Sequence, residues 1–246
     1  MRSDLFAPQN QEQESAQPGL RLQNSKMLKI ALAGEALARQ GSMVAYQGDV
    51  RFEALGAGGI GKFLKQQLTG EGVPLMRVSG RGDVFLADAA ADVHLIDLEG
   101  RDALSVNGRN VLAFEPTLSY DIRMVSGAGV VGNAGLFNCV FTGQGRIAIT
   151  AKGAPVVLAV DAPTYADPQA AIAWSAGLQV GLHRAEQLGL GTLLGRSTGE
   201  RYSMSFAGQG FVVVQPSEEV TGGVVAGGGG GGEQSGVGGL LGNLLR

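Results

Sequence analysis

Residues 56–63, GAGGIGKF, form the most recognisable chemical motif of this chain. They fit both G-x-G-x-x-G and the first seven places of the phosphate-binding loop G-x-x-x-x-G-K, in which backbone amides and the lysine bind phosphates. The eighth place of that loop holds a Ser or Thr that binds magnesium, and here it is Phe63. Both motifs also require a parallel strand that leads into a helix, whereas the flanking segments alternate as hairpins do. We therefore interpret residues 56–63 as a structural loop, and GAGVVG at 127–132 likewise.

The other residues with reactive side chains are few and scattered. One cysteine, Cys139, and two histidines, His94 and His183, leave no internal disulfide and no Cys/His cluster for zinc. Neither histidine has a nucleophile or a paired base beside it in sequence, and no G-x-S-x-G is present. We interpret Cys139 as a small core residue. We interpret the following acidic residues as turn, edge or cap residues: Glu71, Asp83, Asp88, Asp92 and Asp97. The sequence thus predicts no enzyme, no cofactor and no metal site.

Charge and composition narrow the choice of partner and compartment. The formal net charge is −3, with Lys and Arg scattered singly, which disfavours nucleic acid as a partner. The N-terminal 19 residues contain no apolar signal-peptide core, and no stretch approaches the roughly 18 apolar residues of a membrane span. We therefore expect a cytoplasmic protein.

Two short patterns recur three times, and they must supply the framework for any site. The first is G-x-G, in VSGRGDVFLA from Val78, FTGQGRIAIT from Phe141 and FAGQGFVVVQ from Phe206. Apolar residues at every second position on both sides of each G-x-G are typical of strands with one buried face. We expect each copy to be a β-hairpin, because glycine adopts the positive φ that a tight turn needs.

The second pattern, an apolar residue followed by alanine and an aromatic residue, lies upstream of each G-x-G, at residues 44–46, 112–114 and 172–174. Two patterns in the same order indicate three tandem modules, at about residues 26–90, 91–153 and 154–216. Modules of this size bury little apolar surface alone and must share a core. We predict one all-β domain of residues 26–216 with pseudo-threefold repetition. Tyr46, Phe114 and Trp174 are expected in equivalent core positions.

The segments outside this pattern differ in composition. Residues 1–25 are polar and rich in Gln and Glu, which predicts a disordered arm. Residues 60–68 have helical spacing and predict one short helix, with a weaker counterpart at 190–194. Residues 217–246 predict a glycine-rich flexible tail with a short leucine-rich end. Four leucines would share one face if that end were helical: Leu240, Leu241, Leu244 and Leu245. They could dock on a partner protein or a membrane surface, or form a frayed hydrophobic end.

Three features together resemble the family named for altered inheritance of mitochondria, whose bacterial members were filed as a domain of unknown function. They are TGEG with GRGDVFLA in residues 69–87, the strands with the alanine–aromatic pair, and TGE with GQGFVVVQP in residues 198–216. The resemblance covers about residues 26–216. It implies three modules similar to the tryptophan RNA-binding attenuation protein, related to double-stranded β-helices, and homotrimers in which nine modules close a ring. The mitochondrial members are linked to inner-membrane organisation, and no catalytic residues carry over.

Exposed edges also favour a ring, because a row of three β modules leaves two unpaired strand edges that self-association removes. The sequence therefore predicts a structural or interaction protein, a homotrimer that presents its C-terminal tails to a partner. The alternative is a ring that binds RNA or a small ligand, which rests on fold analogy alone. An enzyme would require a pocket in which carboxylates converge on His94 or His183.

Overall fold

The computed structural model describes residues 2–14, 17–55, 73–125, 137–184 and 202–217. Several predictions fall outside these residues: the loop at 56–63, GAGVVG at 127–132, the helix at 60–68 with its counterpart at 190–194, and the tail from residue 218. Four residues of the docking prediction, Leu240, Leu241, Leu244 and Leu245, lie in that tail.

The described chain consists almost entirely of antiparallel strands, so the all-β prediction is confirmed. Three short 3-10 helices accompany them: η1 (Asp4–Phe6), η2 (Pro8–Asn10) and η3 (Gly108–Asn110). The strands are β1 (Gly19–Asn24), β2 (Met27–Arg39), β3 (Met43–Ala54), β4 (Leu75–Leu86), β5 (Asp92–Asn107), β6 (Val111–Phe114), β7 (Ser119–Met124), β8 (Phe137–Ala151), β9 (Val156–Val160), β10 (Thr164–Ala166), β11 (Ala171–Ser175), β12 (Gln179–Arg184), β13 (Tyr202–Ala207) and β14 (Gly210–Val214).

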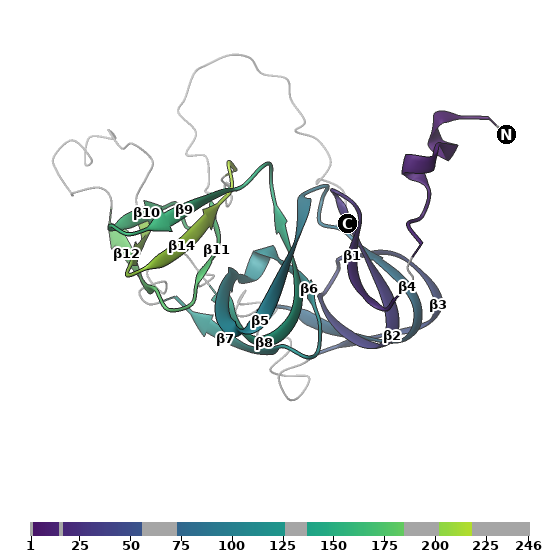
Figure 1. Cartoon of the computed structure of the whole chain (residues 1–246), viewed down its shortest axis with the longest axis horizontal. Coiled ribbons are helices and arrows are strands. Elements are labelled where there is room, and N and C mark those ends of the chain that lie inside the picture. The colour runs from purple at the N-terminus through teal and green to yellow at the C-terminus, as the bar shows by residue number, and fades with distance from the viewer. Residues whose placement is uncertain (1, 15–16, 56–72, 126–136, 185–201, 218–246) are drawn as a thin grey trace, which may run out of the picture.

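Strands that are close in sequence also lie together in space. β1 to β4 occupy one end of the long axis, β5 to β8 the middle, and β9 to β14 the other end (Figure 1). An eleven-stranded sheet runs through all three groups in the order β3-β4-β2-β6-β8-β5-β11-β14-β9, with β1 on β2 and β7 on β8. A three-stranded sheet, β10-β13-β12, completes the last group.

The predicted hairpins at the G-x-G motifs are wrong. β4 and β8 each run through their glycines as one continuous strand. β13 and β14 end and begin at the third motif but belong to different sheets and do not pair with each other. The positive φ angles are nevertheless present, at +121° for Gly80 and +150° for Gly82. A Cβ on Gly82 would lie 2.0 Å from the carbonyl oxygen of Gln47. The glycines therefore allow β3 to approach β4 closely as its neighbour in the sheet, rather than reversing the chain.

The strands that carry the alanine–aromatic pair have the same register against the strand that carries G-x-G. Tyr46 pairs with Val84, Phe114 with Ile147 and Trp174 with Val212. A register shift precedes the alanine in all three pairs, between Met43 and Ala45, between Val111 and Ala113, and between Ala171 and Ala173. A shift of this kind is a β-bulge or a comparable irregularity, which bends the strand.

Buried apolar side chains form three clusters, one within each group of strands, and the clusters continue across the group boundaries. Ala113 and Ala148, from the middle group, pack in the cluster of the first group. Ile172 and Ala173, from the last group, pack in the cluster of the middle group. The groups therefore share cores, as modules of this size require.

Burial of the three aromatic residues is unequal. Phe114 is fully buried and Trp174 is 3% exposed, which confirms their predicted core positions. Tyr46 is 50% exposed, so a core position for Tyr46 is wrong in the single chain, although its pairing register is the same.

The N-terminal arm is more ordered than its composition predicted. Gly19–Asn24 form β1 on β2, so the β domain begins at Gly19 rather than at residue 26, and disorder is the wrong prediction for this part of residues 1–25. Ahead of it, the Gln23 side chain donates a hydrogen bond to the carbonyl oxygen of Gln11 and accepts one from the amide of Gln13. Glutamine-rich composition does not reveal such contacts, because they depend on strands that follow.

Candidate interaction surface

The histidines and the cysteine occupy separate parts of the fold. Cys139 is fully buried on β8, as predicted, and burial raises the pKa of its thiol to about 12, so that the thiol stays protonated and unreactive at neutral pH. His94 lies on β5 opposite Ile149, and its Nε2 is buried without a hydrogen-bond partner among the described residues. His183, on β12, is exposed and stacks on Tyr165 with ring centroids 5.1 Å apart.

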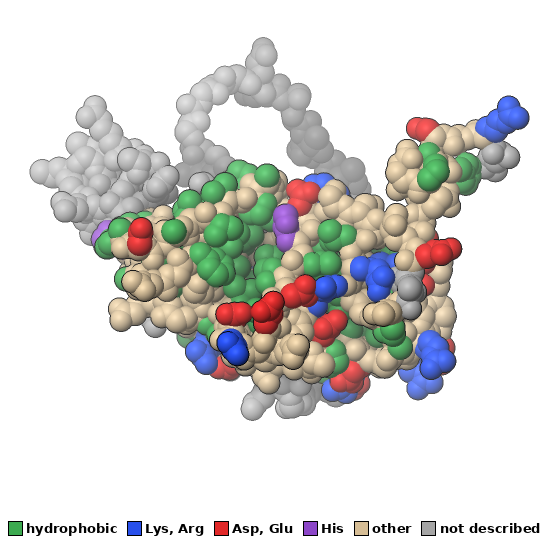
Figure 2. All heavy atoms as spheres, viewed as in Figure 1, with side chains coloured by type: hydrophobic (Ala, Val, Ile, Leu, Met, Phe, Trp, Pro, Cys, Tyr) green, Lys and Arg blue, Asp and Glu red, His purple; other side chains and the backbone are tan. Residues whose placement is uncertain are grey.

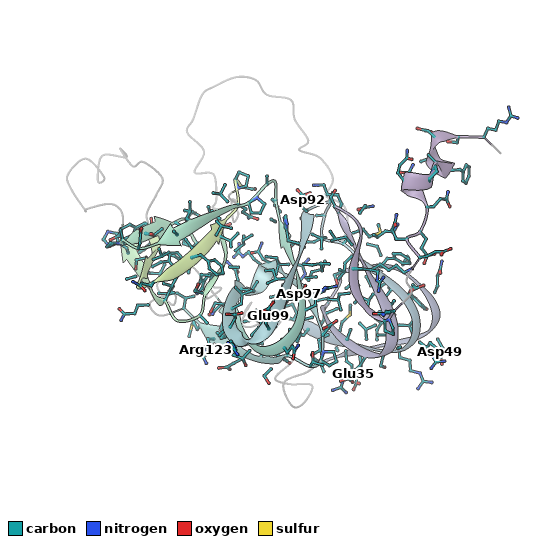
Figure 3. All side chains as sticks on the ribbon, in the orientation of Figure 1. Glu35, Asp49, Asp92, Asp97, Glu99 and Arg123 are labelled. Carbon is teal, nitrogen blue, oxygen red and sulfur yellow. The ribbon has the colours of Figure 1, made fainter. Side chains whose placement is uncertain are left out.

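Four of the five acidic residues singled out from the sequence form ion pairs with nearby basic residues. The pairs are Asp83 with Lys29, Asp88 with Arg39, Asp92 with Lys26, and Asp97 with Arg146. Glu71, the fifth, lies outside the described residues. The labelled carboxylates Asp92, Asp97 and Asp49 are spread along the molecule and do not converge (Figure 3). Their arrangement is that of paired surface charges.

Asp97 and Arg146 form the best-defined of these pairs. The guanidinium donates two hydrogen bonds to the carboxylate, from Nε at 2.6 Å and from Nη2 at 3.0 Å. Its Nη1 also donates to the carbonyl oxygen of Leu20 on β1. The hydrogen bond from Arg146 lowers the pKa of Asp97. Arg146 therefore joins β8 to β5 through the two-point contact and to β1 through Leu20, which is a structural role.

Lys29 is a buried cation that the sequence analysis did not identify. It lies on β2, is 2% exposed, and its Nζ is 2.6 Å from a carboxylate oxygen of Glu12 and 3.3 Å from one of Asp83. Nζ also donates to the carbonyl oxygen of Gln13. Burial disfavours the charged amine, yet the hydrogen bonds to Glu12 and Asp83 outweigh it and raise the pKa of Lys29. The arm is therefore fastened over the first group of strands by a charge that needs partners.

Exposed apolar side chains mark both ends of the molecule. On β3, Val44 and Tyr46 are 52% and 50% exposed, and on β10, Tyr165 is 53% exposed. Near β10, hydrophobic side chains also gather over β9, β11 and β14 (Figure 2), where Val156 and Val157 are more than half exposed. Unpaired strand edges with exposed apolar residues are sites of association between chains. The chain therefore has a candidate interaction surface at each end.

Metal-binding clusters and membrane-spanning helices can be assessed in the part of the chain that the structure describes. Within it, no cluster of three or more His, Cys, Asp or Glu residues could hold a metal ion. Nor does this part contain a helix of the length and hydrophobicity that crossing a membrane requires.

Comparison with known proteins defines the class. The all-β fold is shared with a protein from Streptococcus pyogenes, SPYM3_0169. That crystal structure superimposes with a TM-score of 0.62 at 22% identity, over 80% of this chain and 91% of the other. Residues 20–217 match the family model described as Mitochondrial biogenesis AIM24. The chain belongs to that family. No curated protein is significantly similar to it.

The family and the all-β class could be identified from the sequence, but the features of the surface could not. The exposed edges depend on which strand lies beside which, and that is decided between distant segments such as Leu37 and Phe114, which are 77 residues apart. A usable signal for Lys29 was its place in an otherwise apolar alternation, MLKIAL. A lysine there requires a carboxylate nearby.

Proposed function

We propose that this protein is a non-enzymatic structural protein that forms a homotrimeric ring of β modules, three from each chain. The modules are those expected from the sequence, at about residues 26–90, 91–153 and 154–216. In the ring, each chain presents its tail, residues 217–246, to a partner protein or a membrane surface. The tail end with Leu240, Leu241, Leu244 and Leu245 is the docking segment.

The observation that carries the proposal is the contrast between inner and outer strand edges. Where one group of strands meets the next, an edge of each is paired and its side chains are buried, as at Phe114. At the two ends of the molecule the corresponding edges have no strand beside them within the described residues, and Tyr46 and Tyr165 are half exposed. Self-association would bury them.

A structural role also accounts for the residues with reactive side chains. The acidic residues Asp83, Asp88, Asp92 and Asp97 are engaged in ion pairs. The thiol of Cys139 is buried and protonated at neutral pH. These groups stabilise strand pairs and the core, and each has a structural reason to be where it is.

Light scattering on the full chain at micromolar concentration tests the proposal. We expect a mass three times the 25.2 kDa of one chain. A mass of one chain would show that the ring does not form. A variant that lacks residues 222–246 is expected to keep the trimeric mass but to lose binding to a captured partner or to phospholipid vesicles. Unchanged binding would remove the tail from the proposal.

A further inference from the structure

Two junctions inside the chain show how one group of strands joins the next. At the first, β2 pairs with β6, with Leu37 opposite Phe114 and Ala38 opposite Ala113. At the second, β5 pairs with β11, with Ser105 opposite Trp174 and Val106 opposite Ala173. Both junctions are antiparallel, and both place the aromatic residue and its preceding alanine against consecutive residues of the other strand.

The strand that meets the alanine–aromatic pair at each junction also pairs with the G-x-G strand of its own group. Its register against that G-x-G strand is the same in each group. Residues two, three and four places before the first glycine of the motif pair with Ala36, Leu37 and Ala38 in the first group, and with Leu104, Ser105 and Val106 in the second. In the last group the same places pair with Thr164, Tyr165 and Ala166 of β10. β10 is therefore the equivalent of the two strands that form the internal junctions.

The other half of a junction is present at the opposite end of the chain. Ala45 and Tyr46 of β3 hold the same register against β4 as Ala113 and Phe114 hold against β8. The aromatic ring is also held in the same way. Tyr46 contacts Phe52 edge to face at 5.3 Å, as Phe114 contacts Tyr120 at 5.0 Å. The side chain is thus already oriented as at a formed junction.

The internal junctions and the two terminal edges differ in how deeply their side chains are buried. Phe114, Ala113 and Ala173 are fully buried and Trp174 is 3% exposed, whereas Tyr46 is 50% and Tyr165 53% exposed. β3 and β10 lie at opposite ends of the long axis (Figure 1). One chain therefore cannot pair its own β3 with its own β10, and a second copy is the partner whose edge has the matching register.

We propose that β10 of one copy pairs antiparallel with β3 of the next, with Thr164 opposite Gln47, Tyr165 opposite Tyr46, and Ala166 opposite Ala45. This junction names the contact that would close the ring of the proposed function, and it rests on that function. The contact is head-to-tail, since it uses a different edge of each copy, and such contacts build rings when the rotation closes. It adds three cross-strand pairs, including an aromatic pair that is buried on assembly.

Disulfide cross-linking tests the register directly. In an Ala45→Cys, Ala166→Cys variant, the two cysteines of neighbouring copies are directly opposite, at a Cβ separation of about 4.5–5.5 Å that a disulfide can bridge with a small adjustment. The matched control is Gln47→Cys, Ala166→Cys, which keeps both tyrosines and places the two cysteines two residues out of register, at a diagonal separation of about 7–8 Å. Cys139 is retained in both, because it is buried. We expect mild oxidation to give covalent dimers and trimers from the first variant, at least about five times more than from the control.

A complementation experiment tests the head-to-tail geometry. Tyr46→Lys and Tyr165→Lys each break one edge and leave the other intact. We expect each variant alone to assemble on the order of tenfold more weakly than the native chain, and an equimolar mixture to give a dimer of the two chains that cannot close. Met124→Lys, which charges a similarly exposed apolar residue on β7, away from β3 and β10, is expected to assemble normally.

The outcomes distinguish this junction from the ring itself. A native trimer in which both cysteine variants cross-link equally weakly would overturn the β3–β10 junction and leave the proposed function standing. A native chain that stays monomeric would overturn both. A mixture of Tyr46→Lys and Tyr165→Lys that stays monomeric would show that the contact is not head-to-tail.

Discussion

The internal junction at Phe114 and the terminal edge at Tyr46 are built from the same local parts. Each has an irregular register before an alanine, an aromatic residue paired with a β-branched residue of the G-x-G strand, and an edge-to-face contact with a second aromatic. They differ in the strand that lies beside them. β6 pairs with β2 on the side away from β8, whereas β3 is the end strand of its sheet.

This difference shows that burial in this fold is decided by neighbouring strands and not by the local sequence. Phe114 loses all its exposure and Tyr46 keeps half of it, although phenylalanine and tyrosine have similar apolar surfaces. We therefore propose that an exposed edge with the register and the aromatic contact of an internal junction is an interface that a second copy completes.

Removing the aromatic side chain should have its largest effect at the internal junction. We expect Phe114→Ala to lower the free energy of unfolding by about 3–5 kcal/mol, because it leaves a cavity in a fully buried site. Tyr46→Ala should act mainly through the oligomer, because within one chain it loses a half-exposed side chain and its contact with Phe52. Its effect on urea unfolding should be larger at micromolar concentration and should shrink on dilution below the assembly range. Equal effects of the two substitutions at all concentrations would contradict the comparison.

The close approach of β3 to β4 at Gly82 provides a second test. Gly82→Ala would place a Cβ 2.0 Å from the carbonyl oxygen of Gln47, beside Tyr46, at a φ of +150°. We expect a loss of about 2–4 kcal/mol in unfolding free energy and weaker assembly, since the terminal edge is displaced.

Gly34→Ala is the matched control for this substitution. Gly34 also has a positive φ, at +128°, but no atom lies within 4 Å of its added Cβ. Only backbone strain remains, at a cost of about 1–2 kcal/mol, and assembly should be retained. If both substitutions weakened assembly equally, the close approach of β3 to β4 would not be what positions the edge.

The smallest expected effect concerns the arm over the first group of strands. The hydrogen bond from Lys29 lowers the pKa of Glu12, so its stabilising contribution is complete at neutral pH and is lost as the pH falls below about 4. The pKa of Lys29 is raised, so its contribution persists up to its ordinary pKa, about 10.4, and is lost above that. Between these limits the arm should stay docked.

Amide exchange at Gln13, which donates to the Gln23 side chain, reports on the docked arm. We expect exchange at this amide to accelerate in acid, and already at neutral pH in Glu12→Gln. Glu14→Gln, a change of an exposed carboxylate in the same arm, should leave it unchanged. Acceleration in both variants would mean that net charge, and not the Lys29 contact, holds the arm.

Which segments form strands could be predicted from the sequence better than how those strands pair. Apolar alternation and the alanine–aromatic pairs correctly predicted strands, and the family resemblance is confirmed by the match over residues 20–217. The hairpin prediction failed because a glycine with positive φ can either reverse a chain or let a neighbouring strand approach closely. Here β3 decides between the two, because its Gln47 and Asp49 carbonyl oxygens lie against Gly82 and Gly80.

Burial was harder to predict than strand formation for the same reason. Lys29 is buried only because Glu12 and Asp83 reach it from separate segments. Tyr46 carries the same signature as Phe114 and Trp174, and no local feature indicates that it lacks a neighbouring strand. The candidate surface is therefore visible only when the three registers are compared in the folded chain.

Hydrogen exchange measured at two protein concentrations tests the central claim most directly. At micromolar concentration, the amides of residues 44–47 and 164–166 should be as protected as those of 113–114. On dilution below the assembly range, the amides in these two segments that do not donate to β4 or β13 should exchange rapidly, while 113–114 remain protected. Fast exchange at both terminal edges under conditions where light scattering shows a trimer would contradict the pairing of β3 with β10.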